Sequence, residues 1–145
     1  MLIDSKNVYS DSQAITATAD STNKVNVMSN LGRNQVGDAF ITVKATASFN
    51  NLTSLTIDLQ TSDTENGTYA SIQSVTVPLA SLTKGAKVAA FRVVPTAFVK
   101  PWSKIVYTVT GTAPSTGAVF AALTREEDGL RYAAGLYIDK GIVKG

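Results

Sequence analysis

The sequence predicts an all-β protein, folded as an antiparallel sandwich or barrel of about eight strands. Short segments alternate between apolar and polar residues with the period of two that places one set on a buried face. Turn-forming residues separate most of these segments. Ser and Thr, which suit the wet face of a strand, make up about a fifth of the 145 residues. The expected strands cover residues 13–19, 24–28, 39–49, 54–61, 70–77, 87–94, 104–110 and 117–124.

The central strands carry the clearest alternation. In 39–49 the odd-numbered residues from Ile41 to Phe49 are apolar and the even-numbered residues between them are polar. Segment 54–61 repeats the pattern, with Leu55, Ile57 and Leu59 on one face. The last three strands repeat it less cleanly, through Ala89, Phe91 and Val93, then Ile105, Tyr107 and Val109, then Val119, Ala121 and Leu123. Each of the two sheets is therefore expected to have one apolar face, and these two faces would pack against each other in the core.

Turn residues mark the ends of the strands. Asn50-Asn51 separates the third strand from the fourth, and Asn66-Gly67 follows the fourth with residues that readily adopt the positive φ angles of a tight turn. Pro95 and Pro101 enclose a loop that a central strand would not tolerate. The polar stretch 29–38 is either a crossover between sheets or a lateral arm.

Two terminal segments flank the expected sandwich domain, which covers 13–124. Residues 1–12 are expected to form an N-terminal arm, and residues 125–145 a C-terminal arm or docking tail. The tail begins with the charged run 125–129 and continues with apolar residues broken by three glycines. It is too apolar for a solvated linker, so it either docks on a partner or completes its own domain as a final strand.

The composition argues against most enzyme classes. The chain has no His and no Cys, which removes the residue that titrates near neutral pH, the thiolate nucleophile and the soft metal ligand. The formal net charge of +2 is too small and dispersed for a nucleic-acid partner. No apolar run is long enough to span a membrane, and Met1–Ser5 does not resemble a signal peptide, so we expect synthesis in the cytoplasm.

Three polar clusters have the residue types of a functional site, but their spacing favours plain structural roles. Asp63 and Glu65 could hold a hard cation, but a solvated hairpin turn is the better interpretation. The adjacent carboxylates of 126–128 cannot face each other across a substrate, as acid–base hydrolysis requires. The loop 111–117 lacks the Gly-Lys-Ser/Thr ending of a phosphate loop. We therefore expect no enzyme activity, cofactor or metal.

Several stretches, taken in order, resemble the jelly-roll capsid cement (decoration) proteins of tailed bacteriophages. The matching stretches are Met1–Asp4, Tyr9–Thr16, Ala19, Ser21–Asn23, Leu55–Asp63, Tyr107–Thr112 and Gly117–Leu123. Thr-rich strands recur widely, so the resemblance rests on the order and spacing of these stretches along the chain. The resemblance lies within 1–124, so it implies nothing about the tail 125–145.

The resemblance implies a jelly-roll sandwich that is a structural protein of the virion. Such a protein would sit on the outer capsid surface as a homo-oligomer, a dimer or a trimer, and bridge neighbouring major capsid proteins against genome pressure. Many weak contacts repeated by symmetry would add up to tight attachment. The expected partners are therefore the major capsid protein and further copies of the chain itself.

The residues that would contact these partners lie in three segments, each with self-packing as the alternative. They are Leu2, Ile3, Val8 and Tyr9 in the N-terminal arm; Phe98 and Trp102 in the proline-bracketed loop; and Leu130, Tyr132, Leu136, Tyr137 and Ile138 in the tail. Trp102, the single Trp, could anchor a protein contact, stack on a sugar or cap the core. A carbohydrate-binding or adhesin-type sandwich, as on a phage tail or a cell surface, is accordingly the alternative function.

Overall fold

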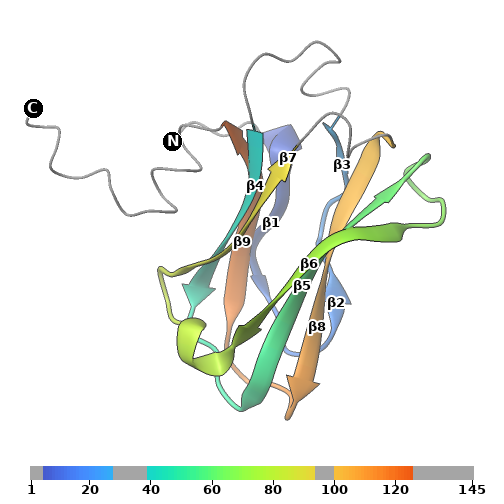
Figure 1. Ribbon diagram of the computed structural model, residues 1–145. Coiled ribbons are helices and arrows are strands. Elements are labelled where there is room, and N and C mark those ends of the chain that lie inside the picture. Colours follow the sequence, from blue (N-terminus) through green and yellow to red (C-terminus); the bar gives the residue numbers. More distant parts are fainter. Residues whose placement is uncertain (1–4, 28–38, 94–99, 126–145) are drawn as a thin grey trace, which may run out of the picture.

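The computed structural model of the protein describes residues 5–27, 39–93 and 100–125. The described residues form an all-β sandwich with two single-turn 3-10 helices (Figure 1). The helices are η1 (Ser5–Asn7) and η2 (Leu79–Ser81). The strands are β1 (Val8–Ala14), β2 (Ala19–Asp20), β3 (Val25–Asn26), β4 (Ala39–Ala47), β5 (Leu52–Ser62), β6 (Ala70–Pro78), β7 (Lys87–Val93), β8 (Trp102–Gly111) and β9 (Ala118–Arg125).

The strands form two antiparallel sheets that pack face to face. The first sheet has the order β1-β9-β4-β7, and the second has the order β2-β8-β5-β6, with β3 also pairing with β8. Strands β2 and β3 contact different stretches of β8, so together they fill one strand position. The result is two layers of four strand positions in the order of a jelly roll, in which successive positions alternate between the sheets except at the β5–β6 hairpin. The predicted antiparallel sandwich is confirmed.

The core lies between the two sheets and follows the predicted alternation. Ile41 and Val43 of β4 face Leu55, Ile57 and Leu59 of β5 across the sandwich, and all five are fully buried. Phe49 lies beyond the end of β4 but is also buried, because its ring packs against Gly117, the residue before β9.

The first strand lies earlier in the chain than predicted. We expected a strand at 13–19 after an arm at 1–12, but β1 begins at Val8 and ends at Ala14, and only Ala19–Asp20 form the short β2. The pairing of β1 with β9 shifts register twice, once between Val8 and Ser10 and again before Gln13. These irregularities interrupt the period of two, so alternation alone could not locate the strand.

The two ends of the sandwich differ. At the upper end of Figure 1, β1, β4 and β8 begin and β3, β7 and β9 end. At the lower end, short connections join β1 to β2, β4 to β5, β6 to β7 and β8 to β9. Among the described residues, no helix is long and apolar enough to cross a membrane.

Candidate interaction surface

The upper end of the sandwich holds the points where the described chain meets its undescribed segments. Ala39 pairs with both Val93 and Arg125 across the first sheet. On the second sheet, Val27 donates a backbone hydrogen bond of 2.9 Å to the carbonyl of Pro101. The described chain therefore meets the segments 1–4, 28–38, 94–99 and 126–145 at this one end. The three segments expected to bind partners are attached to a single end of the domain.

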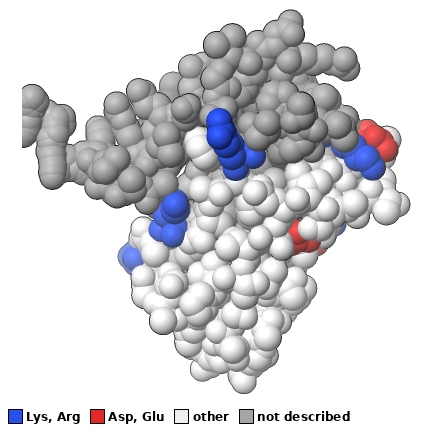
Figure 2. Space-filling view, in the orientation of Figure 1, with Lys and Arg blue, Asp and Glu red and all other residues white. Residues whose placement is uncertain are grey.

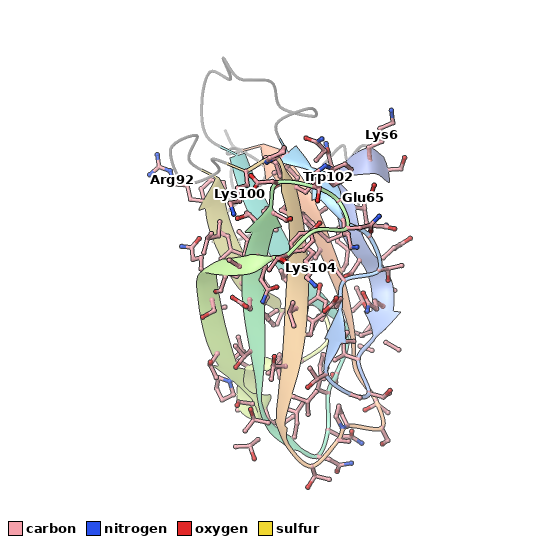
Figure 3. All side chains as sticks on the ribbon, turned by 90° about the vertical axis from the view of Figure 1, so that its right-hand side faces the viewer. Lys6, Glu65, Arg92, Lys100, Trp102 and Lys104 are labelled. Atoms are coloured by element: carbon pink, nitrogen blue, oxygen red, sulfur yellow. The ribbon has the colours of Figure 1, made fainter. Side chains whose placement is uncertain are left out.

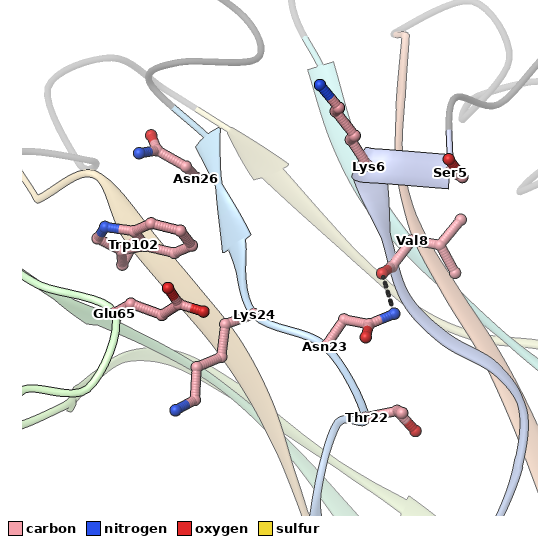
Figure 4. Close-up of a pocket in the computed structure, with 9 residues that line it drawn as sticks. All are labelled: Ser5, Lys6, Val8, Thr22, Asn23, Lys24, Asn26, Glu65 and Trp102. Carbon is pink, nitrogen blue, oxygen red and sulfur yellow. Dashed lines mark hydrogen bonds between the residues drawn. The ribbon is translucent and has the colours of Figure 1, made fainter.

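A groove of about 550 Å³ opens at the same end (Figure 4). It lies between the start of β1, the segment that leads into β3, the β5–β6 hairpin and the start of β8. The lining residues are Ser5, Lys6, Val8, Thr22, Asn23, Lys24, Asn26, Glu65 and Trp102. Hydroxyl, amide, ammonium and carboxylate groups thus surround one indole ring, a mixture that suits hydrogen bonding to a polar partner around one apolar anchor.

The side of the groove that carries Trp102 is held by the β5–β6 hairpin. The hydroxyl of Tyr69 donates to the carbonyl of Glu65 at 2.8 Å and closes the hairpin, and Lys24 donates to the side-chain oxygen of Asn66 at 3.2 Å. The ammonium of Lys104 lies 4.8 Å from the centroid of the Tyr69 ring, within the range of a cation–π contact. Partial burial, followed by the charge of Glu65, raises the pKa of Tyr69.

The opposite side of the groove is held by β1. The side-chain amide of Asn23 donates to the carbonyl of Val8 at 3.1 Å, and the backbone N–H of Asn23 donates to the carbonyl of Tyr9 at 2.9 Å. These two bonds fasten the segment before β3 to β1. The groove is therefore formed between elements that are tied to the sandwich on both sides.

Charged side chains gather around this end. Figure 3 shows Lys6, Glu65, Arg92, Lys100 and Trp102 there. Lys100 lies 3.6 Å from the carboxylate of Asp63, and both side chains are well exposed, so this pair contributes little to stability. Asp63 and Glu65 sit in the turn between β5 and β6, which pair antiparallel, so the predicted hairpin is confirmed.

Beneath the groove, β1 sends two consecutive side chains into the core. Two residues of β1, Tyr9 and Ser10, correspond to a single step along β9, and both are completely buried. The Tyr9 hydroxyl lies 2.7 Å from the Ser103 hydroxyl, and the Ser10 hydroxyl lies 2.9 Å from the Tyr107 hydroxyl. Ser103 and Tyr107 both belong to β8 of the second sheet. The bulge in β1 of the first sheet therefore produces two polar links between the sheets.

The direction of these links follows from the remaining bonds. Ser103 donates to the carbonyl of Val25 at 3.1 Å, and Ser10 donates to the side-chain oxygen of Gln13 at 2.8 Å. Each serine has one proton and has already used it, so each tyrosine is the donor. Burial raises the pKa of Tyr9 and of Tyr107 well above the ordinary range for tyrosine.

The family model of Bbp16 matches residues 9–123. The chain belongs to the Bbp16 family. The match begins one residue into β1 and ends within β9, so it covers the sandwich from its first strand to its last. No curated protein matches the chain.

In this member of the Bbp16 family, the predicted contact residues divide into three groups. Val8 and Trp102 line the groove, on opposite sides of it. Tyr9 is buried and bonded to Ser103, so it packs inside its own domain and does not extend along a neighbour. The remaining candidates lie outside the described residues: Leu2, Ile3, Phe98, Leu130, Tyr132, Leu136, Tyr137 and Ile138.

Sequence reasoning missed two features of the surface. Lys24 and Glu65 were not linked to Trp102, because their positions in the chain give no sign that a groove joins them. Ile72 and Val75 of β6 are 39% and 36% exposed, although the alternation gave no reason to expect them on the surface. The sequence does contain one signal for this exposure. No residue between Ala70 and Pro78 is charged, whereas strands at the edge of a sheet usually carry charged side chains.

Proposed function

We propose that the protein is a non-enzymatic capsid cement protein of a tailed bacteriophage. In this proposal it is made in the host cytoplasm, attaches as a homo-oligomer to the outer face of the phage head and bridges neighbouring major capsid proteins. No nucleic acid or membrane takes part. The shell is then stabilised against genome pressure, because the contacts made by the cement protein must break before capsid subunits can separate.

The observation that carries the proposal is the attachment of all three candidate binding segments to the upper end of one sandwich. A protein that bridges subunits needs a body with adhesive segments directed toward one surface. The groove with Trp102 lies at the same end and adds an anchor of the kind found at protein interfaces. The stretches that resemble cement proteins also fall largely within the matched residues 9–123.

A second observation concerns the body between these contacts. Two buried tyrosine–serine links join the sheets, in addition to the apolar core. Figure 2 shows few charged side chains on the face of the sandwich where β5 and β6 run. A stiff domain whose surface is polar but largely uncharged suits a protein of which many copies lie close together on one capsid.

Co-sedimentation with assembled capsids stripped of outer proteins tests the proposal. We expect saturable binding at a fixed copy number per shell. Lys24→Glu, in the groove, should weaken binding, whereas the matched reversal Lys84→Glu, at the lower end, should leave it unchanged. Deleting residues 130–145 should also weaken binding while circular dichroism still shows a folded sandwich. Absence of binding by the folded wild-type protein would refute the proposal.

The alternative function is a carbohydrate-binding module, and the residues that line the groove support this alternative. An indole beside the amides of Asn23 and Asn26 and the carboxylate of Glu65 can stack on a sugar ring and bond its hydroxyls. A glycan array separates the two functions. Binding to a defined glycan that Trp102→Ala abolishes, together with no binding to capsids, would replace the cement proposal with this one.

A further inference from the structure

The turn of the β5–β6 hairpin contains a chemically reactive pair, Asn66-Gly67. Asn66 is the one asparagine of the sequence that is followed by glycine. Asparagine is a thermolabile residue, because the backbone nitrogen of the next residue can attack its side-chain carbonyl carbon. Most residues shield that nitrogen with a Cβ and the atoms beyond it, whereas glycine leaves it open. Both residues of the pair are exposed, so water reaches them.

A positive charge is held against the side-chain oxygen of Asn66. The Lys24 ammonium donates to this oxygen, Oδ1, at 3.2 Å. When the Gly67 nitrogen adds to Cγ of Asn66, Oδ1 becomes an oxyanion, and the hydrogen bond from Lys24 strengthens as that charge develops. An interaction that is stronger in the transition state than in the ground state accelerates the reaction.

Hydrogen bonds within the turn act in the opposite direction. The backbone N–H of Gly67 donates to the carbonyl of Thr64 at 3.2 Å, and the hydroxyl of Tyr69 donates to the carbonyl of Glu65 at 2.8 Å. The Gly67 nitrogen has to leave its bond with Thr64 before it can reach Cγ of Asn66, so the turn must open locally. The rate of attack therefore depends both on Lys24 and on how often the turn opens.

We propose that Asn66 is a self-modifying site, which deamidates by attack of the Gly67 backbone nitrogen with the assistance of Lys24. A bond forms between that nitrogen and Cγ of Asn66. The bond from Cγ to Nδ2 breaks, and Nδ2 leaves as ammonia with the proton of the Gly67 N–H. Water then opens the resulting succinimide at either of its two carbonyl carbons, which produces aspartate or isoaspartate at position 66.

The new carboxylate would change the charge beside the groove. Lys6 and Lys24 line the groove together with Glu65, so its charged lining residues carry one net positive charge. A carboxylate that pairs with Lys24 cancels this charge. The groove of an aged molecule would therefore differ from that of a newly made one. This property goes beyond the proposed function, and it is tested without capsids.

Peptide mass spectrometry of the full-length protein, incubated at neutral pH, tests the proposal. The peptide that contains position 66 should gain the mass difference between a hydroxyl and an amino group, whereas the peptide that contains Asn51-Leu52 should not. A folded protein that stays unmodified while a free peptide of residues 62–70 is fully converted would overturn the proposal. Loss of a whole ammonia with Lys24 joined to Asn66 would also overturn it, because that product requires attack by the lysine amine.

Substitutions around the turn test the two influences on the rate. Lys24→Met should slow the mass gain roughly three- to tenfold, because the oxyanion loses one hydrogen bond, and Lys24→Arg should retain most of the rate. The matched control Lys104→Met removes the ammonium that lies 4.8 Å from the centroid of the Tyr69 ring, and it should not slow the gain. Tyr69→Phe should speed the gain, because the turn opens more often. Equal rates for the wild type and Lys24→Met would overturn the role assigned to Lys24, and both measurements stand whether or not capsid co-sedimentation succeeds.

Discussion

At the scale of single residues, the two partners of a buried tyrosine–serine hydrogen bond do not contribute equally to stability. Tyr107 donates to Ser10, and Ser10 donates onward to Gln13. The side-chain oxygen of Gln13 also accepts from the backbone N–H and the hydroxyl of Thr22, at 2.9 and 3.0 Å. Removing the tyrosine hydroxyl leaves Ser10 with an acceptor for its proton, whereas removing the serine hydroxyl leaves a buried donor without an acceptor.

Substitutions at this link should therefore differ in effect. Tyr107→Phe should lower the free energy of unfolding by about 1 kcal/mol, the net value of one hydrogen bond. Ser10→Ala should lower it more, by roughly 1–3 kcal/mol, because the buried phenol hydroxyl loses its acceptor. The double variant should lie close to Tyr107→Phe. Urea unfolding followed by circular dichroism measures all three, and equal losses for the two single variants would contradict the assigned direction.

Gly117 combines a positive φ of 135° with close packing. A Cβ built there would collide with the ring of Phe49. Gly85 also has a positive φ, 87°, but no heavy atom lies within 4 Å of its would-be Cβ. Gly85→Ala should therefore show the backbone effect alone, about 1–2 kcal/mol, and Gly117→Ala a larger loss. Thermal unfolding of the pair provides the measurement, and similar melting temperatures would show that Phe49 moves aside without cost.

At the scale of elements, the Asn50 side chain makes three of the hydrogen bonds that close the lower end. The Asn50 side-chain oxygen accepts from the backbone N–H groups of Ser115 and Thr116 at 2.8 and 3.2 Å, and its amide donates to the Ser115 hydroxyl at 2.8 Å. The loop between β8 and β9 is thereby tied to the turn between β4 and β5. Asn50, together with the hydroxyl of Thr116, which donates to the carbonyl of Ser48 at 3.1 Å, thus joins two connections that each run between the sheets.

Replacing Asn50 should loosen this loop. Asn50→Ala removes all three bonds, so the amides of Ser115 and Thr116 should exchange with solvent faster, and stability should fall by roughly 1–2 kcal/mol. Asn50→Asp keeps the two acceptor roles and should retain most of the amide protection. Hydrogen exchange resolved by residue tests this, and equal exchange in the two variants would show that the side chain does not hold the loop.

The elements also show how far the sequence could predict the fold. Strands with one clean apolar face, such as β4 and β5, were located within a few residues, because a flat half-buried strand imposes the period of two. β1 was misplaced because its irregular pairing buries the neighbours Tyr9 and Ser10 together. Alternation of apolar and polar residues is a local signal in the sequence. A bulge depends on the pairing with the neighbouring strand, here β9, and local alternation does not report it.

The positions of the turns were predicted correctly, but the reason why a turn contains its particular residues was not always the predicted one. Asn51 has the positive φ of 68° expected of its turn, whereas Asn66 and Gly67 form their turn without positive φ. Gly67 is needed there for space, since a Cβ would come within 2.8 Å of the Ser62 hydroxyl oxygen. The groove was beyond prediction, because it joins residues near positions 6, 24, 65 and 102 that only the tertiary fold brings together.

At the scale of the whole molecule, the buried tyrosines predict how stability depends on pH. The pKa values of Tyr9 and Tyr107 are raised in the folded state above the ordinary value of about 10. Both phenols are neutral in both states at lower pH, so their contribution to stability is fully present below about pH 10. Above it the unfolded chain releases two protons that the folded state retains, and stability falls.

The expected slope is about 2.7 kcal/mol per pH unit above about pH 10 from these two tyrosines together. Urea unfolding at a series of alkaline pH values measures it. Tyr107→Phe should reduce the slope by about half, because one of the two retained protons is gone. A slope that the substitution does not change would show that other groups control unfolding in alkali.

The pairing of β1 with β9 also determines when the molecule can fold. It joins the first and last described strands, with Val8 opposite Ala122, and β2 likewise depends on β8. A fold built from such distant pairs forms slowly, on a scale of milliseconds to seconds. During synthesis the β5–β6 hairpin can form early, but the first sheet stays incomplete until β9 has left the ribosome. The sandwich therefore closes only after β9 has emerged, and a chain that stops short of β9 exposes the apolar face of β4 to the cell.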